Sequence, residues 1–403
     1  MSSSHNRPAR SFVALAIMVA LLNSTAASPL YGVYRARWSL DSFTISAIFA
    51  VYAGGTLLAL LMLGRLSDRL RDRRVVIGAA LLVVIAGALV FGTATDIHAL
   101  FIGRFLAGIG TGAVTGAANA ALIELDPRLD TRRSAVLATS VFTIGCAVGP
   151  AISALCLALD VDPLRLPFLI IAALAAAALA GLAIAPWRPI RFAAPIEQAA
   201  ASPGPTPRAR RLAAFAIAAG SVFIVWSVGS SFASFGPSFV HELLHLPSMA
   251  AAGLIVTVFQ LVGGLSQMAS GRLSSDRALI GGTVIVAIAT LGCLVTIEVA
   301  SPVGFVLGTV LVGIGYGVAF VGAAGVVNRI APPDKRASFV SAFYVTAYLA
   351  NCLPVLLLGR LSDLFGLAGA FLALTVFTCL ATLVLVPVAI IVLQPGRSRR
   401  RAS

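Results

Sequence analysis

Two histidines in the second half of the chain stand at a spacing that could bind zinc. The segment His241-Glu242-Leu243-Leu244-His245 fits the pattern H-E-x-x-H, in which two histidines one helical turn apart hold the metal and the glutamate acts as a base. A catalytic zinc also needs a third protein ligand, and the other two histidines stand far away in the sequence. Prolines bound the segment on both sides, so it has at most about two helical turns. A membrane zinc hydrolase is therefore the remote alternative, and we expect neither a metal nor an enzymatic activity.

One arginine, Arg104, is the only ionisable residue deep inside an otherwise apolar run. If the run crosses a bilayer, such a charge is costly and marks a functional site by default. On a helix, Arg104 would share one stripe of polar and small residues with Gly108, Thr111, Thr115 and Asn119, because these recur every three to four residues. Two explanations stay open: contact with a solute in a cavity, or a structural role in which the guanidinium binds carbonyls or reaches the interface.

The remaining reactive residues offer little chemistry. The 5 cysteines lie in or at the ends of apolar runs without clustered spacing, which is typical of packing residues rather than of a disulfide framework or a metal site. The sequence contains no G-x-x-x-x-G-K-[ST] segment, so it lacks the loop that binds ATP in many motor and transport proteins. We therefore expect no cofactor.

The elements that must position these residues are about twelve long apolar runs. They lie at 12–34, 43–63, 75–95, 99–123, 134–158, 166–186, 213–237, 248–270, 278–299, 303–327, 338–358 and 368–393. Each has about 20 residues or more, enough for an α-helix to cross a hydrocarbon core of about 30 Å. In lipid, backbone groups must be satisfied within the segment, which favours helices. The sequence thus predicts an all-α membrane protein with twelve transmembrane helices.

The distribution of cations predicts how the chain is oriented. Of the 29 Lys and Arg residues, 24 fall at the termini and in alternate connections, and only Arg35, Arg37, Arg165 and Arg360 fall in the other connections. Because cationic loops resist translocation, the rich side is predicted to be cytoplasmic, with both termini there. We expect a multi-pass protein of the cell membrane, that is, the inner or plasma membrane.

Composition excludes the soluble classes. Hydrophobic residues make up 59% of the chain and charged residues 11%, against about 25% charged in soluble domains. The net charge of +14 would favour nucleic acid in a soluble protein, but here the loop asymmetry accounts for it. We expect the lipid bilayer as a partner, no nucleic acid, and a monomer.

The two halves of the sequence repeat each other. The segment 108–112, Gly-Ile-Gly-Thr-Gly, recurs as Gly-Ile-Gly-Tyr-Gly at 313–317, an offset of 205, and two loops recur at nearly the same offset. A Pro- and Ala-rich stretch without periodicity divides the halves. We therefore expect two pseudo-symmetric six-helix bundles with a parallel repeat. They comprise residues 1–187 and 213–403, with a cytoplasmic linker at 188–212 and a basic C-terminal tail.

The sequence resembles the major facilitator superfamily over nearly its whole length. The loop between the second and third runs carries Gly64, Leu66, Asp68 and Arg69 followed by the basic pair Arg73-Arg74, similar to the family's G-x-L-x-D-R-x-G-R-R. The fourth run carries Arg104 and its glycines, like the family's helix-4 motif. The resemblance implies the fold of that family and transport by alternating access.

The loop motif predicts a conformational latch. Asp68 would stand at a helix end, and Arg69 and Arg73 would reach acidic groups on neighbouring helices, with Glu124 and Asp126 as partners. These bonds, in the loop that begins at Gly64, would hold the outward-facing state and break in the inward-facing one. The alternative is that the charges merely solvate a loop.

In the fifth run, Gly145, Gly149 and Pro150 resemble the G-x-x-x-G-P motif of exporters in this family. The glycines allow close packing, and the proline removes one helical hydrogen bond and allows a bend. The resemblance to drug and small-molecule exporters implies efflux.

The family analogy places the substrate cavity between helices of both halves. The expected lining residues are Asn23, Arg104, Thr111, Thr115, Asn119, Trp226, Gln260, Tyr316, Tyr344, Tyr348 and Asn351. Aromatic and amide groups suit an amphipathic organic solute better than an inorganic anion, which would need several cations. Each aromatic residue could instead serve only in packing.

We expect a secondary active transporter that exports hydrophobic or amphipathic small molecules and uses protons as the coupling ion. No acidic residue stands in the middle of a predicted cavity helix, so the proton carrier would be Asp68, Glu124 or Asp126 on one side, or Glu242 or Glu298 on the other. An importer or facilitator of a sugar or metabolite stays open as the alternative.

Overall fold

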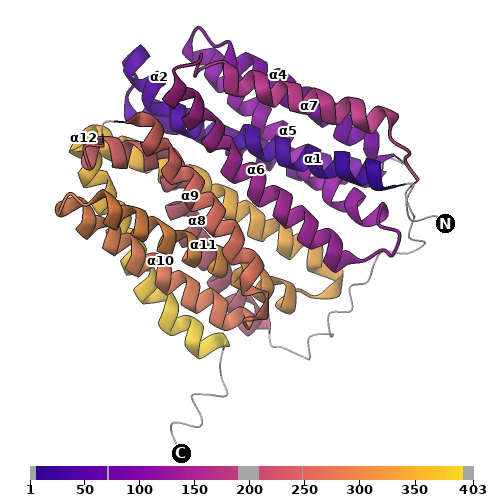
Figure 1. The fold of residues 1–403 in the computed structure, drawn as a ribbon. Helices are drawn as coiled ribbons and strands as arrows, with labels where there is room; N and C mark the ends of the chain where they lie inside the picture. The colour runs from indigo at the N-terminus through magenta and orange to yellow at the C-terminus, as the bar shows by residue number, and fades with distance from the viewer. Residues whose placement is uncertain (1–5, 70–71, 189–207, 247, 394–403) are drawn as a thin grey trace, which may run out of the picture. The chain divides into compact units, whose positions relative to one another are not determined.

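The structure is a computed structural model that describes residues 6–69, 72–188, 208–246 and 248–393; the side chains of 63–69 and 334 are outside this description. All regular elements within these ranges are helical (Figure 1). They are α1 (Arg7–Thr25), η1 (Ser28–Leu30), α2 (Tyr31–Trp38), α3 (Ser42–Arg69), α4 (Arg73–Gly92), α5 (Ile97–Glu124), α6 (Thr131–Leu159), α7 (Leu166–Ile184), α8 (Arg208–Ser238), the π-helical turn η2 (Phe239–Leu243), α9 (Met249–Ala269), η3 (Ser270–Arg272), α10 (Ser275–Glu298), α11 (Pro302–Ile330), η4 (Pro333–Lys335) and α12 (Arg336–Leu393).

The described residues form 11 helical segments that are long and apolar enough to cross a membrane. This supports the all-helical membrane fold, but the number differs from the twelve runs in the sequence. The difference arises because the last two runs, 338–358 and 368–393, fall within one continuous segment, α12, of 58 residues. Gly366 interrupts that segment with φ 75° and ψ 168°, a conformation that essentially only glycine adopts. The expected boundary between the two runs is therefore a backbone break rather than a loop.

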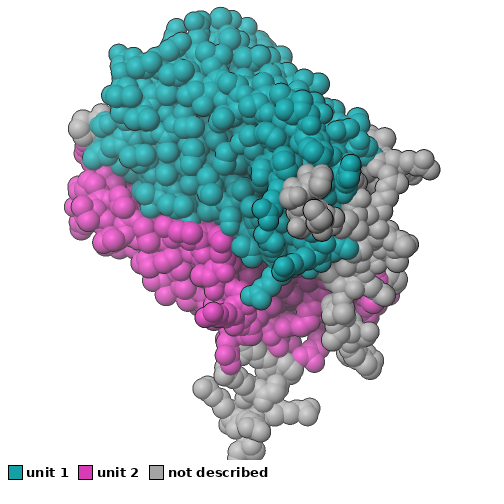
Figure 2. All heavy atoms as spheres, turned by 45° about the vertical axis from the view of Figure 1, so that its right-hand side comes forward, with its two compact units in different colours: residues 1–193, 234–241, 246–261 teal, residues 194–233, 242–245, 262–403 magenta. Residues whose placement is uncertain are grey.

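The contacts divide the chain into two compact units (Figure 2). Unit 1 comprises residues 1–193, 234–241 and 246–261, and unit 2 comprises 194–233, 242–245 and 262–403. Most of the expected linker, 189–207, is outside the described residues, and the domain boundaries drawn from the sequence stay a prediction.

In unit 1, α5 packs closely against α3 and α4 through its glycines. A Cβ atom added to Gly110 would lie 3.1 Å from the backbone nitrogen of Val84 in α4. One added to Gly112 would lie 2.8 Å from the carbonyl oxygen of Thr56 in α3. Small residues therefore let three helix backbones approach without a hydrophobic driving force between them.

The repeated glycines pack in the same way in unit 2. A Cβ atom added to Gly315 would lie 2.8 Å from the backbone nitrogen of Val286 in α10. One added to Gly317 would lie 3.0 Å from the backbone nitrogen of Gln267 in α9. The internal repeat in the sequence thus corresponds to a repeated mode of helix packing.

The apolar core of unit 2 joins four helices. Ile217 and Val222 of α8 pack with Leu279 of α10, Val326 of α11 and Phe343 of α12, all buried. Because α8 precedes the others in the chain by up to about 120 residues, these contacts are what bring its polar and aromatic residues beside α11 and α12.

Acidic and hydroxyl side chains cap the starts of several helices. The Oδ1 atoms of Asp72, Asp96 and Asp130 accept hydrogen bonds of 2.9–3.0 Å from backbone N–H groups at the starts of α4, α5 and α6. Ser301 does the same for α11 at 3.2 Å. Since each capping bond satisfies a donor that the helix itself leaves open, these residues have a structural role.

Candidate functional site

Arg104 of α5 is buried, with 2% of its surface exposed. Its Nη1 donates a 2.8 Å hydrogen bond to the carbonyl oxygen of Ser24, in the last turn of α1. Carbonyls in that turn have no partner within the helix, and a cation there is favoured by the helix dipole. The guanidinium thus binds a carbonyl, as one of the two explanations for this residue requires.

Aromatic rings cover the same guanidinium. Its carbon lies 4.6 Å from the ring centroid of Tyr52 and 5.9 Å from that of Phe49, both in α3. An arginine held over aromatic faces gains a cation–π attraction of about 1–2 kcal/mol when desolvated. Among the described residues, no carboxylate forms an ion pair with Arg104, so carbonyl and ring contacts hold a charge that remains uncompensated.

Several hydrogen-bond donors in this part of unit 1 have no partner within the described structure. The Nε atom of Arg104, the amide nitrogen of Asn23 and the hydroxyl of Tyr31 are all buried and unpaired. Asn23 directly precedes Ser24 in α1, and the ring of Tyr31 lies edge-on to Phe49 at 6.4 Å. Because an unpaired buried polar group is costly, the arrangement favours a ligand that accepts hydrogen bonds.

The remaining residues of the polar stripe on α5 differ in their roles. The hydroxyl of Thr111 lies 3.0 Å from the Ala20 carbonyl of α1 and 2.8 Å from that of Ala107. Thr115 returns its hydroxyl to the Thr111 carbonyl at 2.7 Å. Asn119, one turn further, is exposed. Only the part of the stripe that faces α1 is therefore tied into the Arg104 region.

In unit 2, two of the expected cavity residues lie around a third, Trp226. The ring of Trp226 in α8 lies 6.4 Å from Tyr316 in α11 and 5.7 Å from Tyr348 in α12. Phe320 adds a fourth ring at 5.7 Å from Trp226. The indole nitrogen of Trp226 is buried without a partner, so this aromatic cluster also presents one open donor.

Of the other expected cavity residues, Tyr344 is linked to this cluster through Phe343, whose ring lies 6.1 Å from that of Phe320. Tyr344 stands next to Phe343, 5.8 Å between centroids, and has 39% of its surface exposed. Asn351 in α12 and Gln260 in α9 are half-buried. The structure thus brings Trp226, Tyr316 and Tyr348 together and links Tyr344 to them through Phe320 and Phe343.

Two of the six latch residues meet directly. Arg73 at the start of α4 donates from Nε to Glu124 Oε1, at the end of α5, at 2.8 Å, with both side chains partly exposed. Gly64, Asp68 and Arg69 lie on α3, and their side chains fall outside the description.

The remaining latch residue, Asp126, pairs with an arginine outside the expected latch set. Asp126 is fully buried and lies 2.6 Å from Arg10 Nη1 of α1, as an ion contact rather than an aligned hydrogen bond. Its Oδ1 accepts from the backbone N–H of Arg128 at 2.9 Å, and Arg10 also donates to the Ser134 hydroxyl at 3.2 Å. Asp126 therefore ties α1 to the α5–α6 connection, and Arg10 extends this contact to α6.

Unit 2 contains an ion pair at the repeated position. Arg329 at the end of α11 pairs with Asp276 at the start of α10, with a second contact of 3.3 Å. At the offset of 205, Arg329 corresponds to Glu124, so the cation and the anion have exchanged helices between the two units.

The motif of the fifth apolar run, Gly145, Gly149 and Pro150, lies on α6 and packs this helix against α1. A Cβ atom added to Gly145 would lie 3.0 Å from Leu21 Cβ, and one added to Gly149 would lie 2.6 Å from the Leu22 carbonyl oxygen. Pro150 lies within the continuous helix α6. The two glycines thus have the packing role that their spacing allows.

Replacing Gly149 by valine is expected to destabilise unit 1 by about 1–3 kcal/mol, because the added methyl groups meet the backbone of α1. Thermal unfolding of the purified protein in detergent measures the change. Gly116→Val on α5 is the matched control, since nothing lies within 4 Å of a Cβ atom there. Equal midpoints for the two variants would contradict the packing role.

The H-E-x-x-H segment does not form one α-helical face. Residues 239–243 form a π-helical turn, and His245 lies beyond it with φ 52°. The Nδ1 atom of His241 is 2.7 Å from the Leu246 carbonyl. Within the described ranges, no three His, Cys, Asp or Glu side chains are grouped as metal ligands.

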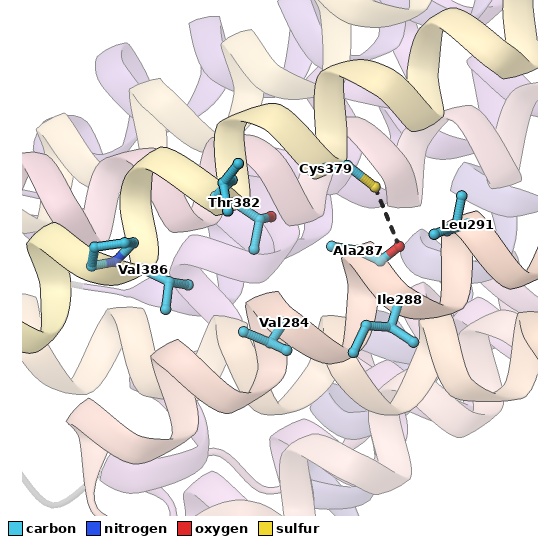
Figure 3. Close-up of a pocket in the computed structure, with 9 residues that line it drawn as sticks. Val284, Ala287, Ile288, Leu291, Cys379, Thr382 and Val386 are labelled. Carbon is cyan, nitrogen blue, oxygen red and sulfur yellow. Dashed lines mark hydrogen bonds between the residues drawn. The ribbon is translucent and has the colours of Figure 1, made fainter.

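A hollow of about 300 Å³ lies between α10 and the last part of α12 (Figure 3). Apart from the thiol of Cys379, which lies 3.8 Å from the Ala287 carbonyl, and Thr382, its lining is apolar. Ile288 and Leu291 in its wall are largely exposed. The lining has no charged groups and few polar groups. The hollow could therefore accommodate an apolar chain, but it could not orient a polar solute.

Sequence reasoning missed the residues that complete the site around Arg104. Tyr52, Phe49 and Ser24 stand within apolar runs, and no spacing rule connects them with Arg104. One signal was available: all 6 tyrosines of the chain fall in or next to predicted spans, although this does not identify which of them meet the arginine.

Comparisons with known proteins agree with this architecture. The sequence model of a family described as the Major Facilitator Superfamily matches residues 13–355. A comparison with curated proteins gives no match.

Among solved structures, the chain is similar to a bacterial homologue of the human lysosomal transporter Spinster in an inward-facing, unoccupied conformation. The TM-score is 0.79 at 15% identity, covering 98% of this chain and 99% of the other. It is also similar to a POT family transporter in complex with a thioalcohol-conjugated peptide (0.75, 16%, 95% and 96%) and to a D-xylose–proton symporter (0.73, 13%, 95% and 97%). At these identities the likeness concerns the fold.

Proposed function

This chain belongs to the major facilitator superfamily, and from that premise we propose that it is a secondary active transporter that exports hydrophobic or amphipathic small molecules in exchange for protons. Its fold neighbours are transporters, and it is a multi-pass membrane protein. Alternating access would expose one solute site to each side of the membrane in turn.

The observation that carries the proposal is the state of Arg104. A buried cation within a membrane-spanning helix, with no carboxylate partner among the described residues and an unpaired Nε, is costly to maintain. A solute that brings a carboxylate, carbonyl or other acceptor group would compensate that cost when it binds. The Tyr52 and Phe49 rings beside it would contact the apolar part of the same molecule.

The aromatic cluster in unit 2 supports an amphipathic solute rather than a small inorganic ion. Trp226, Tyr316 and Tyr348 offer apolar faces and one unpaired indole donor. No arginine or lysine belongs to that cluster as the structure describes it, whereas a phosphate or sulfate would call for several cations.

Proton coupling requires a carboxylate that can change its protonation. We propose Glu124, the last residue of the helix that carries Arg104, or Asp126 in the connection that follows it. Each is paired with an arginine in this structure, Glu124 with Arg73 and Asp126 with Arg10. Protonation would weaken either pair and so would favour a state in which the pair is open.

Efflux and cytoplasmic termini are proposed on sequence grounds. The Gly145, Gly149 and Pro150 motif resembles that of exporters, and the cation-rich connections place both termini in the cytoplasm of a cell-membrane protein. An importer of a sugar or metabolite is the alternative, which the direction of flux decides.

We propose that the Arg73–Glu124 pair is part of a latch, together with Asp68 and Arg69, whose side chains lie outside the described residues. The pair joins the ends of α4 and α5, so it would tie these helices in one state of the transport cycle. Because the pair is partly exposed, it contributes only about 1 kcal/mol or less to stability. Removing it should therefore change transport without unfolding the protein.

Glu124→Gln is expected to lower the transport rate about fivefold or more while leaving thermal stability almost unchanged, because loss of the Arg73–Glu124 bond shifts the equilibrium between states. Arg73→Gln should give a similar loss, and the double variant should be no slower than the slower single variant. Arg74→Gln is the control, since Arg74 has only a 3.7 Å contact with Asp72. Additive losses in the double variant would count against the latch.

Flux into or out of proteoliposomes tests the proposed function. A panel of amphipathic organic solutes is measured with and without an imposed pH gradient, and a protonophore is added as the control. We expect saturable flux of at least one solute that moves opposite to the proton gradient and stops when the gradient is collapsed. Flux in the same direction as protons would identify an importer instead.

A further inference from the structure

A second site of concentrated charge lies at one end of unit 1. Arg7, Arg10, Arg128 and Arg133 line a hollow of about 150 Å³, together with Leu125 and Pro127. These residues come from the start of α1, the connection that follows α5, and the first turn of α6. Four arginines from three separate parts of the chain therefore line one hollow.

The acidic groups near the hollow do not neutralise it. Asp126 is fully buried and pairs with Arg10. Asp130 is exposed and caps α6, where its Oδ1 accepts the Arg133 backbone N–H at 3.0 Å. Across the described residues, the guanidinium groups of Arg7, Arg128 and Arg133 form no ion pair. Like charges gathered in this way repel each other unless an anion lies between them.

The Arg10–Asp126 contact fixes the position of the hollow. Arg10 is also held by the Ser134 hydroxyl at 3.2 Å, whose own oxygen donates to the Leu122 carbonyl at 3.1 Å. Arg10 is thus held in a mostly buried network, whereas Arg7, Arg128 and Arg133, which line the same hollow, are exposed. This arrangement is a built site rather than a random grouping of surface arginines.

We propose that this hollow binds a phosphate-bearing anion. Arginine forks match phosphate oxygens in paired hydrogen bonds, and a space of about 150 Å³ exceeds the share of one water molecule, about 30 Å³, several-fold. The hollow opens at the ends of membrane-spanning helices, where the headgroup of an anionic lipid lies. A soluble phosphate compound shares this chemistry, and the experiment separates the two sources.

The need for cations on the cytoplasmic side does not by itself explain the arrangement. That rule concerns the number of cations in a connection and requires no convergence on one hollow. Arg132 shows the difference, since it stands in the same connection, is exposed, and does not line the hollow.

The test compares two double variants of equal net charge. Arg128→Gln with Arg133→Gln removes two cations from the hollow, and Arg132→Gln with Arg208→Gln removes two exposed cations elsewhere. Each full-length protein is reconstituted in nanodiscs of mixed phosphatidylglycerol and phosphatidylcholine and re-extracted, and the retained lipid is measured by mass spectrometry. In parallel, thermal unfolding of the delipidated protein is followed with added inorganic phosphate and pyrophosphate.

If a lipid headgroup is the ligand, the unchanged protein retains phosphatidylglycerol over phosphatidylcholine, the first double variant retains about tenfold less, and the control variant retains as much as the unchanged protein. If a soluble anion is the ligand, phosphate or pyrophosphate stabilises the unchanged and control proteins but not the first variant. The proposal is overturned if none of the three proteins retains phosphatidylglycerol preferentially or is stabilised by phosphate or pyrophosphate. It is also overturned if the two double variants lose these effects equally.

Discussion

Replacing Arg104 by methionine is expected to abolish solute transport while the protein remains folded. Methionine has a similar length and removes the charge, the hydrogen bond to the Ser24 carbonyl and the unpaired Nε. If Arg104 binds an acceptor group of the solute, the loss of a buried charged contact costs about 2 kcal/mol or more, which corresponds to about 30-fold in affinity. Initial rates in proteoliposomes at low solute concentration measure this loss.

The stability of Arg104→Met should rise or stay almost unchanged, although its transport is lost. Removing an uncompensated buried cation and replacing it by an apolar side chain of similar volume is often neutral or stabilising. Thermal unfolding of Arg104→Met in detergent therefore gives a midpoint at or above that of the unchanged protein. A variant that is both inactive and unfolded would indicate a structural role as the helix cap of α1.

Two conservative variants separate charge from geometry. Arg104→Lys keeps the charge but replaces the planar fork by a point charge, which stacks poorly on Tyr52. We expect transport by this variant to be clearly reduced but measurable. Tyr52→Phe keeps the ring beneath the guanidinium, so it should retain more activity than Tyr52→Leu. Unchanged transport by Arg104→Lys would favour a purely structural role for Arg104.

Asp126→Asn is expected to cause the largest loss of stability, about 3–5 kcal/mol, because it leaves Arg10 as a buried charge without its partner. The side chain of Arg10 is 12% exposed and that of Asp126 is not exposed at all, so water can solvate the remaining cation only poorly. Unfolding in mixed micelles with a rising fraction of SDS measures the free energy.

A matched control and a compensating pair test this explanation. Asp130→Asn makes the same chemical change four residues away on an exposed residue, and asparagine caps a helix as well as aspartate does. It should leave stability within about 0.5 kcal/mol. Arg10→Met combined with Asp126→Leu removes both charges and should recover most of the loss. If the double variant is less stable than Asp126→Asn, the buried pair is not the cause.

The helical membrane fold could be predicted from the sequence because its determinants are local. Apolar length and helix-breaking residues each act within one span or one connection. The repeat at 108–112 and 313–317 corresponds to equivalent helix packing in the two units, because glycine spacing determines which helix faces can approach. The number of helical segments differs from the twelve predicted runs only at Gly366. There the last two runs follow each other without a loop, separated only by a kink in the backbone.

The candidate site was predicted less completely because its contacts are not local. The sequence identified Arg104 from its isolation in an apolar run, but its partners Ser24 and Tyr52 are 80 and 52 residues away along the chain. Likewise, Arg10 was known only as one cation of the N-terminal segment, and nothing in its spacing connects it with Asp126. Residues of ordinary type that acquire a role through tertiary contact leave no pattern to read.

The most direct test of the central claim is the two-sided accessibility of one residue beside Arg104. Asn23→Cys, in a background from which the native cysteines have been removed, is reconstituted in oriented proteoliposomes and exposed to a membrane-impermeant maleimide on either side. A transporter with alternating access is expected to be labelled from both sides, and more slowly when a transported solute is present. Labelling from one side only, at a rate that no solute changes, would contradict the claim.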